Sequence, residues 1–205
     1  MTPSPAPIPC EEIAAHPEFR SLLTIPGIAV DLRYATPDNF VGRAVYGGLD
    51  CAFLRRESAE AIAQAAAWLT RHCPGVTLVV LDALRPQRVQ EALWKELEGT
   101  PLTKYLAHPA RRSIHSFGMA VDVTLLDAEG RELDMGTGFD EMVAASGHFH
   151  AGLPGHVQRN RLLLLGVMHA AGFAHIDSEW WHYELPGSRA LPQIDNAASG
   201  PWRLM

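Results

Sequence analysis

The chain has 205 residues, 47% of them hydrophobic, which is enough to bury the core of a single domain. Its formal net charge of −6 at pH 7 argues against a nucleic-acid-binding surface and against a polybasic membrane contact. No run of about 18 apolar residues occurs, so no transmembrane helix is expected. Three cysteines without C-x-x-C spacing argue against a disulfide scaffold and favour a reducing compartment.

Residues 1–27 are expected to form a loose N-terminal arm. The first nine are proline-rich and have neither the basic region nor the apolar run of a secretory signal, which together with the cysteines predicts a cytoplasmic protein. Residues 28–34 alternate like a strand. Ser58 is a plausible N-cap of the next element, a helix whose apolar residues recur at helical spacing until Pro74-Gly75 ends the pattern.

The middle of the chain continues this mixture of helices and strands. Residues 76–81 form an apolar run typical of a buried strand, and Pro86 suits the first turn of a helix that ends near Glu98. Residues 100–113 are expected to be a loop. Residues 119–126 alternate with period two, which is typical of a strand that carries polar residues on one face.

The last third begins with a glycine- and histidine-rich loop over residues 136–156, whose histidines we expect to be solvated: His148, His150 and His156. A long helix follows over residues 156–171, with Gly172 at its C-cap. Residues 176–185 are predicted to form the final strand.

These elements occur without regular βαβ repeats and therefore predict an α+β fold with a central antiparallel sheet flanked by helices. We expect one catalytic domain over residues 28–190. Residues 191–205 are expected to be a C-terminal tail that packs on the same domain.

Two short segments carry the residue types of a hydrolytic metal site. The first is His115-x6-Asp122 and the second is Glu179-x-x-His182. Two imidazoles and one carboxylate would leave one position on a zinc ion for water. Glu179, three residues from His182, is close enough to take a proton from that water without being a ligand itself. Each segment alone is a weak signal, whereas the two together are a stronger one.

The predicted strand around Asp122 supports this interpretation. Period two places Asp122 on one face with Ala120 and Thr124, where a carboxylate is costly to bury unless it is paired or bound to a cation. Gly118 offers a backbone break that could turn His115 toward Asp122. The residues alone leave an alternative open, in which Asp122 is a structural aspartate and the histidines belong to the core.

Five segments, in order, resemble the D-alanyl-D-alanine dipeptidase family, the zinc D,D-dipeptidases associated with vancomycin resistance and D-alanine recycling. Several matching segments in family order are far more specific than one. In this chain the segments are Asp31–Phe40, Asp82–Gln87, Ser113–Leu125, Asp134–Asp140 and Glu179–Tyr183.

The resemblance implies one zinc ion per chain, located at the sheet and held by His115, Asp122 and His182. It implies that Glu179 is the general base toward water and then the general acid toward the leaving amine. Arg85, between a predicted strand and a predicted helix, would oppose the oxyanion of the tetrahedral intermediate. Positions three apart in a regular strand point to opposite faces, so Glu179 must lie at a strand end or bulge to reach the metal.

A free dipeptide carries an ammonium group, and the resemblance makes Asp140 the candidate that binds it. Tyr34 and Ser113 are candidates for further polar contacts with the substrate. The chain also departs from the family pattern, because Phe117 stands where the family usually has arginine. In addition, the connection from Arg85 to His115 is shorter than in the resistance enzymes. Both departures predict a more open cleft.

The expected function is hydrolysis of D-alanyl-D-alanine, or of related D,D-dipeptides, to free amino acids. The expected partner is a small-molecule dipeptide, with neither nucleic acid nor membrane, and no sequence feature indicates the oligomeric state. One alternative is a D,D-carboxypeptidase or L,D-endopeptidase of the same superfamily that acts on longer peptidoglycan stem peptides. Another is a non-catalytic zinc-binding module.

Overall fold

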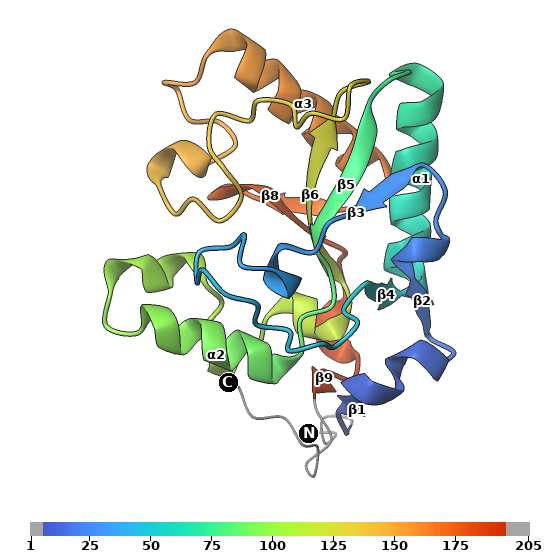
Figure 1. Ribbon diagram of the computed structural model, residues 1–205, viewed down its shortest axis with the longest axis vertical. Helices are drawn as coiled ribbons and strands as arrows, with labels where there is room; N and C mark the ends of the chain where they lie inside the picture. The colour runs from blue at the N-terminus through green and yellow to red at the C-terminus, as the bar shows by residue number, and fades with distance from the viewer. Residues whose placement is uncertain (1–5, 196–205) are drawn as a thin grey trace.

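The computed structural model describes residues 6–195 (Figure 1). Its α-helices are α1 (Arg56–His72), α2 (Gln87–Leu97) and α3 (Gly155–Ala170). Its strands are β1 (Ile8–Pro9), β2 (Phe19–Ser21), β3 (Ile28–Val30), β4 (Phe53–Arg55), β5 (Thr77–Asp82), β6 (Ala120–Leu126), β7 (Ala174–Ile176), β8 (Glu179–Glu184) and β9 (Ile194–Asp195). Short 3-10 helices lie at Cys10–Ala15, Leu22–Thr24, Arg33–Ala35, Pro101–Tyr105, Pro109–Arg111, Ile114–Phe117, Ala144–Ser146 and Ser188–Ala190.

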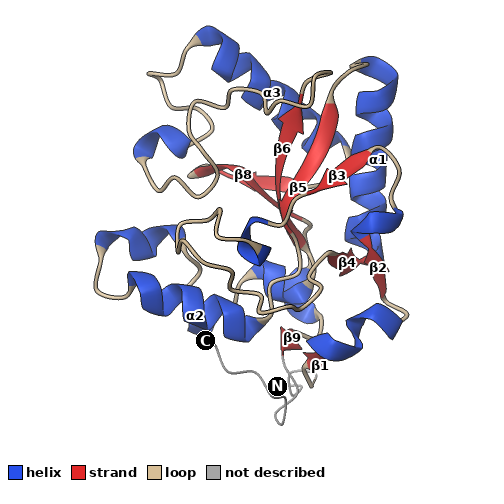
Figure 2. Cartoon of the chain, in the orientation of Figure 1, coloured by secondary structure: helices blue, strands red, loops and turns tan. Residues whose placement is uncertain are grey.

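A five-stranded sheet forms the centre of the fold, with the strand order β3-β5-β6-β8-β7. The pairs β5–β6, β6–β8 and β7–β8 are antiparallel, whereas the edge strand β3 runs parallel to β5. Figure 2 shows this sheet in red, with α1 and α3 beside it and α2 below. The α+β class and the central, mainly antiparallel sheet are therefore confirmed, and the parallel strand β3 is an addition to the prediction.

The alternation in β6 separates the hydrophobic core from a polar face. Val121, Val123 and Leu125 lie in the largest core cluster, together with apolar residues of α1 and α3. Asp122 lies between them in sequence and lines a cavity on the other face. Burial of an aliphatic side chain contributes about 1.5–3 kcal/mol, so the core residues fix the register that presents Asp122 to the cavity.

Residues 6–27 pack as part of the same fold rather than as a loose arm. Strand β2 pairs with β4, and β1 pairs with β9 near the other end of the described chain. The side chains of Ile13 and Leu22 are fully buried, because they pack into the two main core clusters. The predicted boundary at residue 28 is therefore not a boundary in packing. The C-terminal tail is described only to Asp195, so Trp202 and the rest of residues 196–205 lie outside the described part.

Three local predictions differ from the structure. Ser58 is not an N-cap: α1 begins at Arg56, and the buried Ser58 hydroxyl contacts the Met119 sulfur at 3.2 Å. The predicted strand over 176–185 is a hairpin, in which β7 ends at Ile176 and β8 begins at Glu179. The predicted strand over 28–34 ends at Val30 and is followed by a 3-10 helix.

In the histidine-rich loop, the prediction that His148 is solvated is wrong. His148 is 1% exposed, and its backbone N–H donates to the Asp177 carbonyl. Burial and the neighbouring His175 lower the pKa of His148 to about 4, so it is a neutral core residue. His150 and His156 are exposed as predicted. Across residues 6–195, no helix combines the length and hydrophobicity needed to cross a membrane.

Candidate active site

Three charged or titratable side chains form a row across the central sheet. Asp82 of β5 is paired with Asp122 of β6, and Asp122 is paired in turn with His182 of β8. All three residues are buried. Two carboxylates placed side by side repel each other, so this row requires positive charge close to it.

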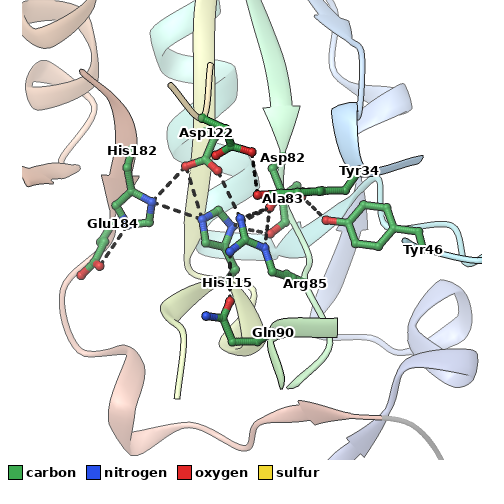
Figure 3. Close-up of polar contacts among 11 residues, drawn as sticks. Tyr34, Tyr46, Asp82, Ala83, Arg85, Gln90, His115, Asp122, His182 and Glu184 are labelled. Atoms are coloured by element: carbon green, nitrogen blue, oxygen red, sulfur yellow. Dashed lines mark hydrogen bonds and ion pairs between the residues drawn. The ribbon is translucent and has the colours of Figure 1, made fainter. Parts of the chain in front are cut away.

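His115, Asp122 and His182 bring three ligand atoms together (Figure 3). The His115 Nε2 atom lies 3.2 Å from His182 Nδ1 and 3.4 Å from an Asp122 carboxylate oxygen. His182 Nδ1 lies 2.9 Å from the same carboxylate oxygen. A tetrahedral zinc ion with bonds of about 2.0–2.1 Å separates its ligand atoms by roughly 3.3–3.4 Å. The triangle therefore has the dimensions of three zinc ligands with a fourth position left open.

The outer nitrogen of each imidazole is held so that the inner one faces the triangle. The His115 Nδ1–H donates to the Ala83 carbonyl at 2.8 Å, which leaves the Nε2 lone pair for a metal. The His182 Nε2 atom contacts a Glu184 carboxylate oxygen at 3.0 Å, which leaves Nδ1 on the inner side. Hydrogen bonds from the outer nitrogens of ligating histidines orient the ring and raise its basicity. Both rings are therefore oriented for a cation.

The electrostatics of the triangle also favour a cation. Burial disfavours a charged His182 ring, but its hydrogen bonds with Asp122 and Glu184 outweigh this and raise the pKa of His182 to about 10. Burial likewise disfavours a charged Asp122, yet His115 and His182 hold the pKa of Asp122 well below its usual value. The site thus stabilises an anionic carboxylate and positive charge at the same point. The donor set and its charge fit a divalent metal ion.

Arg85 is held rigidly at the edge of this row. Its Nε and Nη2 atoms donate to one Asp82 carboxylate oxygen at 2.9 and 2.6 Å, and its Nη1 donates to the Gln90 side chain at 3.0 Å. Its Nη2 also lies 3.4 Å from an Asp122 oxygen, and its guanidinium carbon lies 4.9 Å from the centroid of the Tyr34 ring. Burial opposes the charge, but Asp82 keeps the pKa of Arg85 well above its usual value. A permanent, oriented cation therefore faces the ligand triangle.

Glu179 is the first residue of β8, next to an irregularity in the β7–β8 register. This is the strand-end position that the prediction required. Burial, with a smaller contribution from Asp122, raises the pKa of Glu179 to about 7 against the opposing effects of His182 and Arg85. A carboxylate with a pKa near neutrality can both accept and return a proton.

Asp140 and Tyr34 form a pair beside Arg85. The Tyr34 hydroxyl donates to an Asp140 carboxylate oxygen at 2.7 Å, and the Tyr34 ring is fully buried between Arg85 and Phe139. Burial is the main reason that the pKa of Asp140 is raised to about 8, since the Tyr34 hydrogen bond and Arg85 offset it only in part. Ser113 is buried two residues before His115.

A cavity of ≈ 540 Å³ joins these groups. The predicted site residues all line it: Tyr34, Arg85, Ser113, His115, Asp122, Asp140, Glu179 and His182. Phe117 does not line it, because its side chain packs in a separate buried cluster with Ile114 and Met119. Phe117 therefore adds no apolar wall to the cavity, and the predicted opening of the cleft by this departure stays a prediction. The connection between Arg85 and His115 contributes residues 103–108 to the wall, so this shorter connection still covers one side of the site.

A family model described as D-ala-D-ala dipeptidase, of peptidase family M15, matches residues 19–199 of the chain. The chain belongs to this family. It is therefore a metallopeptidase, and among the described residues its His-Asp-His triangle is the group that could hold a metal ion.

The family's curated members support the match along most of the chain. The D-alanyl-D-alanine dipeptidase of Escherichia coli is 41% identical over 169 residues, which are 82% of this chain and 84% of that protein. The enzyme of the same name from Enterococcus faecalis is 31% identical over 78% of this chain and 86% of its own length. A solved LD-carboxypeptidase superposes with a TM-score of 0.49 and 16% identity over 85% of this chain and 71% of its own, a likeness too remote to bear on activity.

Three side chains that support the M15 site were not predicted. Asp82 and Gln90 hold Arg85, and Glu184 holds His182. A signal for Glu184 was present, because residues two apart on a strand share a face, and Glu184 follows His182 by two. Asp82 ends the apolar run of β5, where a buried carboxylate already requires a partner. Gln90 gave no signal of its own.

Proposed function

We propose that this chain is a zinc D,D-dipeptidase that hydrolyses D-alanyl-D-alanine, or a closely related D,D-dipeptide, to free amino acids. The observation that carries the proposal is the convergence of one metal-sized ligand triangle, Glu179 and Arg85 on a single cavity. A structural metal site needs neither a free carboxylate of pKa about 7 nor a clamped guanidinium. The names of the curated relatives agree with this activity.

In the proposed reaction, zinc bound by His115, Asp122 and His182 would polarise the scissile carbonyl and lower the pKa of a water toward about 7. Glu179 accepts a proton from the attacking water as the new C–O bond forms. It then delivers this proton to the nitrogen of the leaving residue as the C–N bond breaks. Its pKa of about 7 suits both transfers, because neither protonation state is strongly favoured at neutral pH.

Arg85 supports the same reaction electrostatically. Addition of water places negative charge on the carbonyl oxygen, and an oriented cation stabilises that charge without having to reorganise. Asp82 and Gln90 fix the guanidinium plane before the substrate arrives. We therefore propose that Arg85 stabilises the tetrahedral intermediate.

Asp140 is proposed to bind the substrate ammonium, with Tyr34 orienting its carboxylate and the Ser113 hydroxyl as a further polar contact. Burial raises the pKa of Asp140 to about 8 despite Arg85, and an ammonium group beside it would favour the ionised form. Substrate and carboxylate would thus each stabilise the charge of the other.

We further propose that residues 28–190 form the catalytic domain together with the packed residues 6–27. A cytoplasmic location is also proposed, and it is supported by three free thiols at Cys10, Cys51 and Cys73. The competing functions are a D,D-carboxypeptidase or L,D-endopeptidase that acts on stem peptides. Both would use the same metal chemistry, so substrate length is what separates them from a dipeptidase.

The test is a substrate panel assayed with zinc: D-Ala-D-Ala, L-Ala-L-Ala, N-acetyl-D-Ala-D-Ala and a stem tripeptide ending in D-Ala-D-Ala. We expect D-Ala-D-Ala to be cleaved at least about tenfold more efficiently than its N-acetyl form, because acetylation removes a charge-assisted contact with Asp140. Equal cleavage of the acetylated or longer substrates would favour a carboxypeptidase instead.

A variant tests the role of Glu179 in the same assay. Glu179→Ala should keep zinc near one per chain and lower kcat at least about 10²-fold, because general acid–base catalysis typically contributes that much. Glu60→Ala, which removes an exposed carboxylate of α1, is the matched control and should change neither quantity. Loss of zinc from Glu179→Ala would instead make Glu179 a ligand.

A further inference from the structure

Two non-glycine residues of the described chain have positive φ angles, and both line the cavity. They are Arg112, with φ of 61°, and Asp140, with φ of 58°. Arg112 is the more unusual, because its ψ of 136° takes it outside the left-handed helical region that other residues tolerate. Backbone conformations of this kind cost energy and tend to occur where a side chain serves a function. The two residues carry opposite charges.

The Arg112 guanidinium has no partner among the described residues, a feature it shares with the neighbouring Arg111, but only Arg112 combines this with a positive φ angle. Arg85 and Arg189 each donate hydrogen bonds to nearby protein groups. The Arg112 side chain is exposed and makes no hydrogen bond or ion pair with the residues that the structure describes, although its backbone N–H donates to the Pro109 carbonyl at 3.1 Å. Arg112 thus combines a strained backbone conformation with a guanidinium that has no partner among the described residues. It is also only three residues from His115, one of the metal ligands.

Three cations that line the cavity come from a different segment than Asp140. Lys104, Arg111 and Arg112 lie in the connection after α2, whereas Asp140 follows β6. Figure 1 shows these segments apart, the first in green below the sheet and the second in yellow to orange to the left of the sheet. A dipeptide has an ammonium at one end and a carboxylate at the other. The cavity that contains the ligand triangle is therefore also lined by groups of both charges that a zwitterion carries.

We infer that Arg112 binds the terminal carboxylate of the leaving residue, as the counterpart of Asp140 at the ammonium. This inference rests on the proposed function and narrows its substrate class to peptides whose scissile bond is followed by one residue with a free carboxylate. It excludes internal bonds of longer peptides, because such bonds place no carboxylate within reach of the guanidinium.

The test compares D-Ala-D-Ala with its C-terminal amide in the wild type and in two variants. Arg112→Gly removes the charge and suits the positive φ, so it should raise the melting temperature by about 2 °C or more. Its kcat/KM should fall about tenfold or more for D-Ala-D-Ala and less than about threefold for the amide, because the amide lacks the anion. Arg112→Lys should recover part of the loss. Arg71→Ala, at the exposed end of α1, should change neither substrate.

Equal losses on dipeptide and amide, or no loss at all, would overturn the inference. The proposed function can fail separately, and binding distinguishes the two cases. Calorimetric titration of both compounds into zinc-loaded Glu179→Ala protein, with and without Arg112→Gly, needs no turnover. Selective loss of dipeptide binding would support the inference even if the wild type cleaved neither compound. Equal binding of the two compounds would overturn it.

Discussion

Replacement of Asp140 by asparagine should stabilise the metal-free protein while it weakens the enzyme. Burial raises the pKa of Asp140 in the folded protein to about 8, from an ordinary value of 3.8. The folded state therefore holds this proton more tightly than the unfolded state does between about pH 4 and pH 8. Stability from this group is complete below about pH 4 and is lost as pH rises through 8.

The size of the effect follows from the shift. A difference of about 4 pKa units between 8 and 3.8, at 1.36 kcal/mol each, sets an upper bound of about 5–6 kcal/mol above pH 8. Part of the Asp140 surface is exposed to solvent. Solvent screening therefore reduces the expected change in the free energy of unfolding to about 1–3 kcal/mol. For a protein of this size, that corresponds to roughly 2–10 °C in melting temperature. Asparagine can accept the Tyr34 hydrogen bond and tolerates the positive φ.

The assay is thermal unfolding of wild type and Asp140→Asn in chelator, at pH 5 and at pH 8.5. We expect the variant to melt higher at pH 8.5 and the difference to shrink at pH 5. Asp134→Asn is a control of opposite sign, because hydrogen bonds from His156 and the Gly136 N–H lower the pKa of Asp134. A variant that melts no higher than wild type at pH 8.5, or a difference independent of pH, would refute the argument. The same variant should lose activity on D-Ala-D-Ala.

Two further predictions concern the groups that hold the site in place. Glu184→Gln should raise the zinc dissociation constant about 10–100-fold in a chelator competition, because the carboxylate orients His182 from outside the ligand triangle; an unchanged affinity, matching that of a Glu60→Gln control, would contradict this role. Arg85→Lys should lower kcat at least about 10²-fold with zinc near one per chain, because a lysine cannot contact Asp82 and Gln90 together while facing the oxyanion. A change in KM alone would assign Arg85 to substrate binding instead.

Local sequence patterns correctly predicted those helices and strands in which the apolar residues of the pattern are also the buried ones. The apolar run before Asp82, the proline at the start of α2 and the alternation of β6 each correspond to an element within a residue or two. The hairpin of β7 and β8 was predicted as one strand, because two turn residues, Asp177 and Ser178, interrupt an otherwise continuous pattern. The N-terminal residues were predicted as an arm since their strands are too short to give a periodic signal and depend on distant partners.

In the candidate site, the sequence predicted which residues take part but not how they are arranged. Ligand types and their resemblance to a family predicted which side chains belong together, and all of them line one cavity. Strand register decides that Asp82 and Asp122 are neighbours, and register depends on core packing that no single segment contains. The positive φ of Arg112 is a backbone feature that the residue type does not predict.

The proposed metal ligands and the proposed substrate-binding residues lie in different kinds of structure. The proposed metal ligands Asp122 and His182 are paired on adjacent strands, and the neighbouring core fixes their separation. Arg112 and Asp140 instead lie in connections, where a change of residue does not disturb the sheet. Substitutions in residues 100–112 and 136–142 should therefore alter which peptide ends are accepted while leaving zinc affinity unchanged. Substitutions in β6 or β8 should act on the metal first, because the strands set the distances on which its coordination depends.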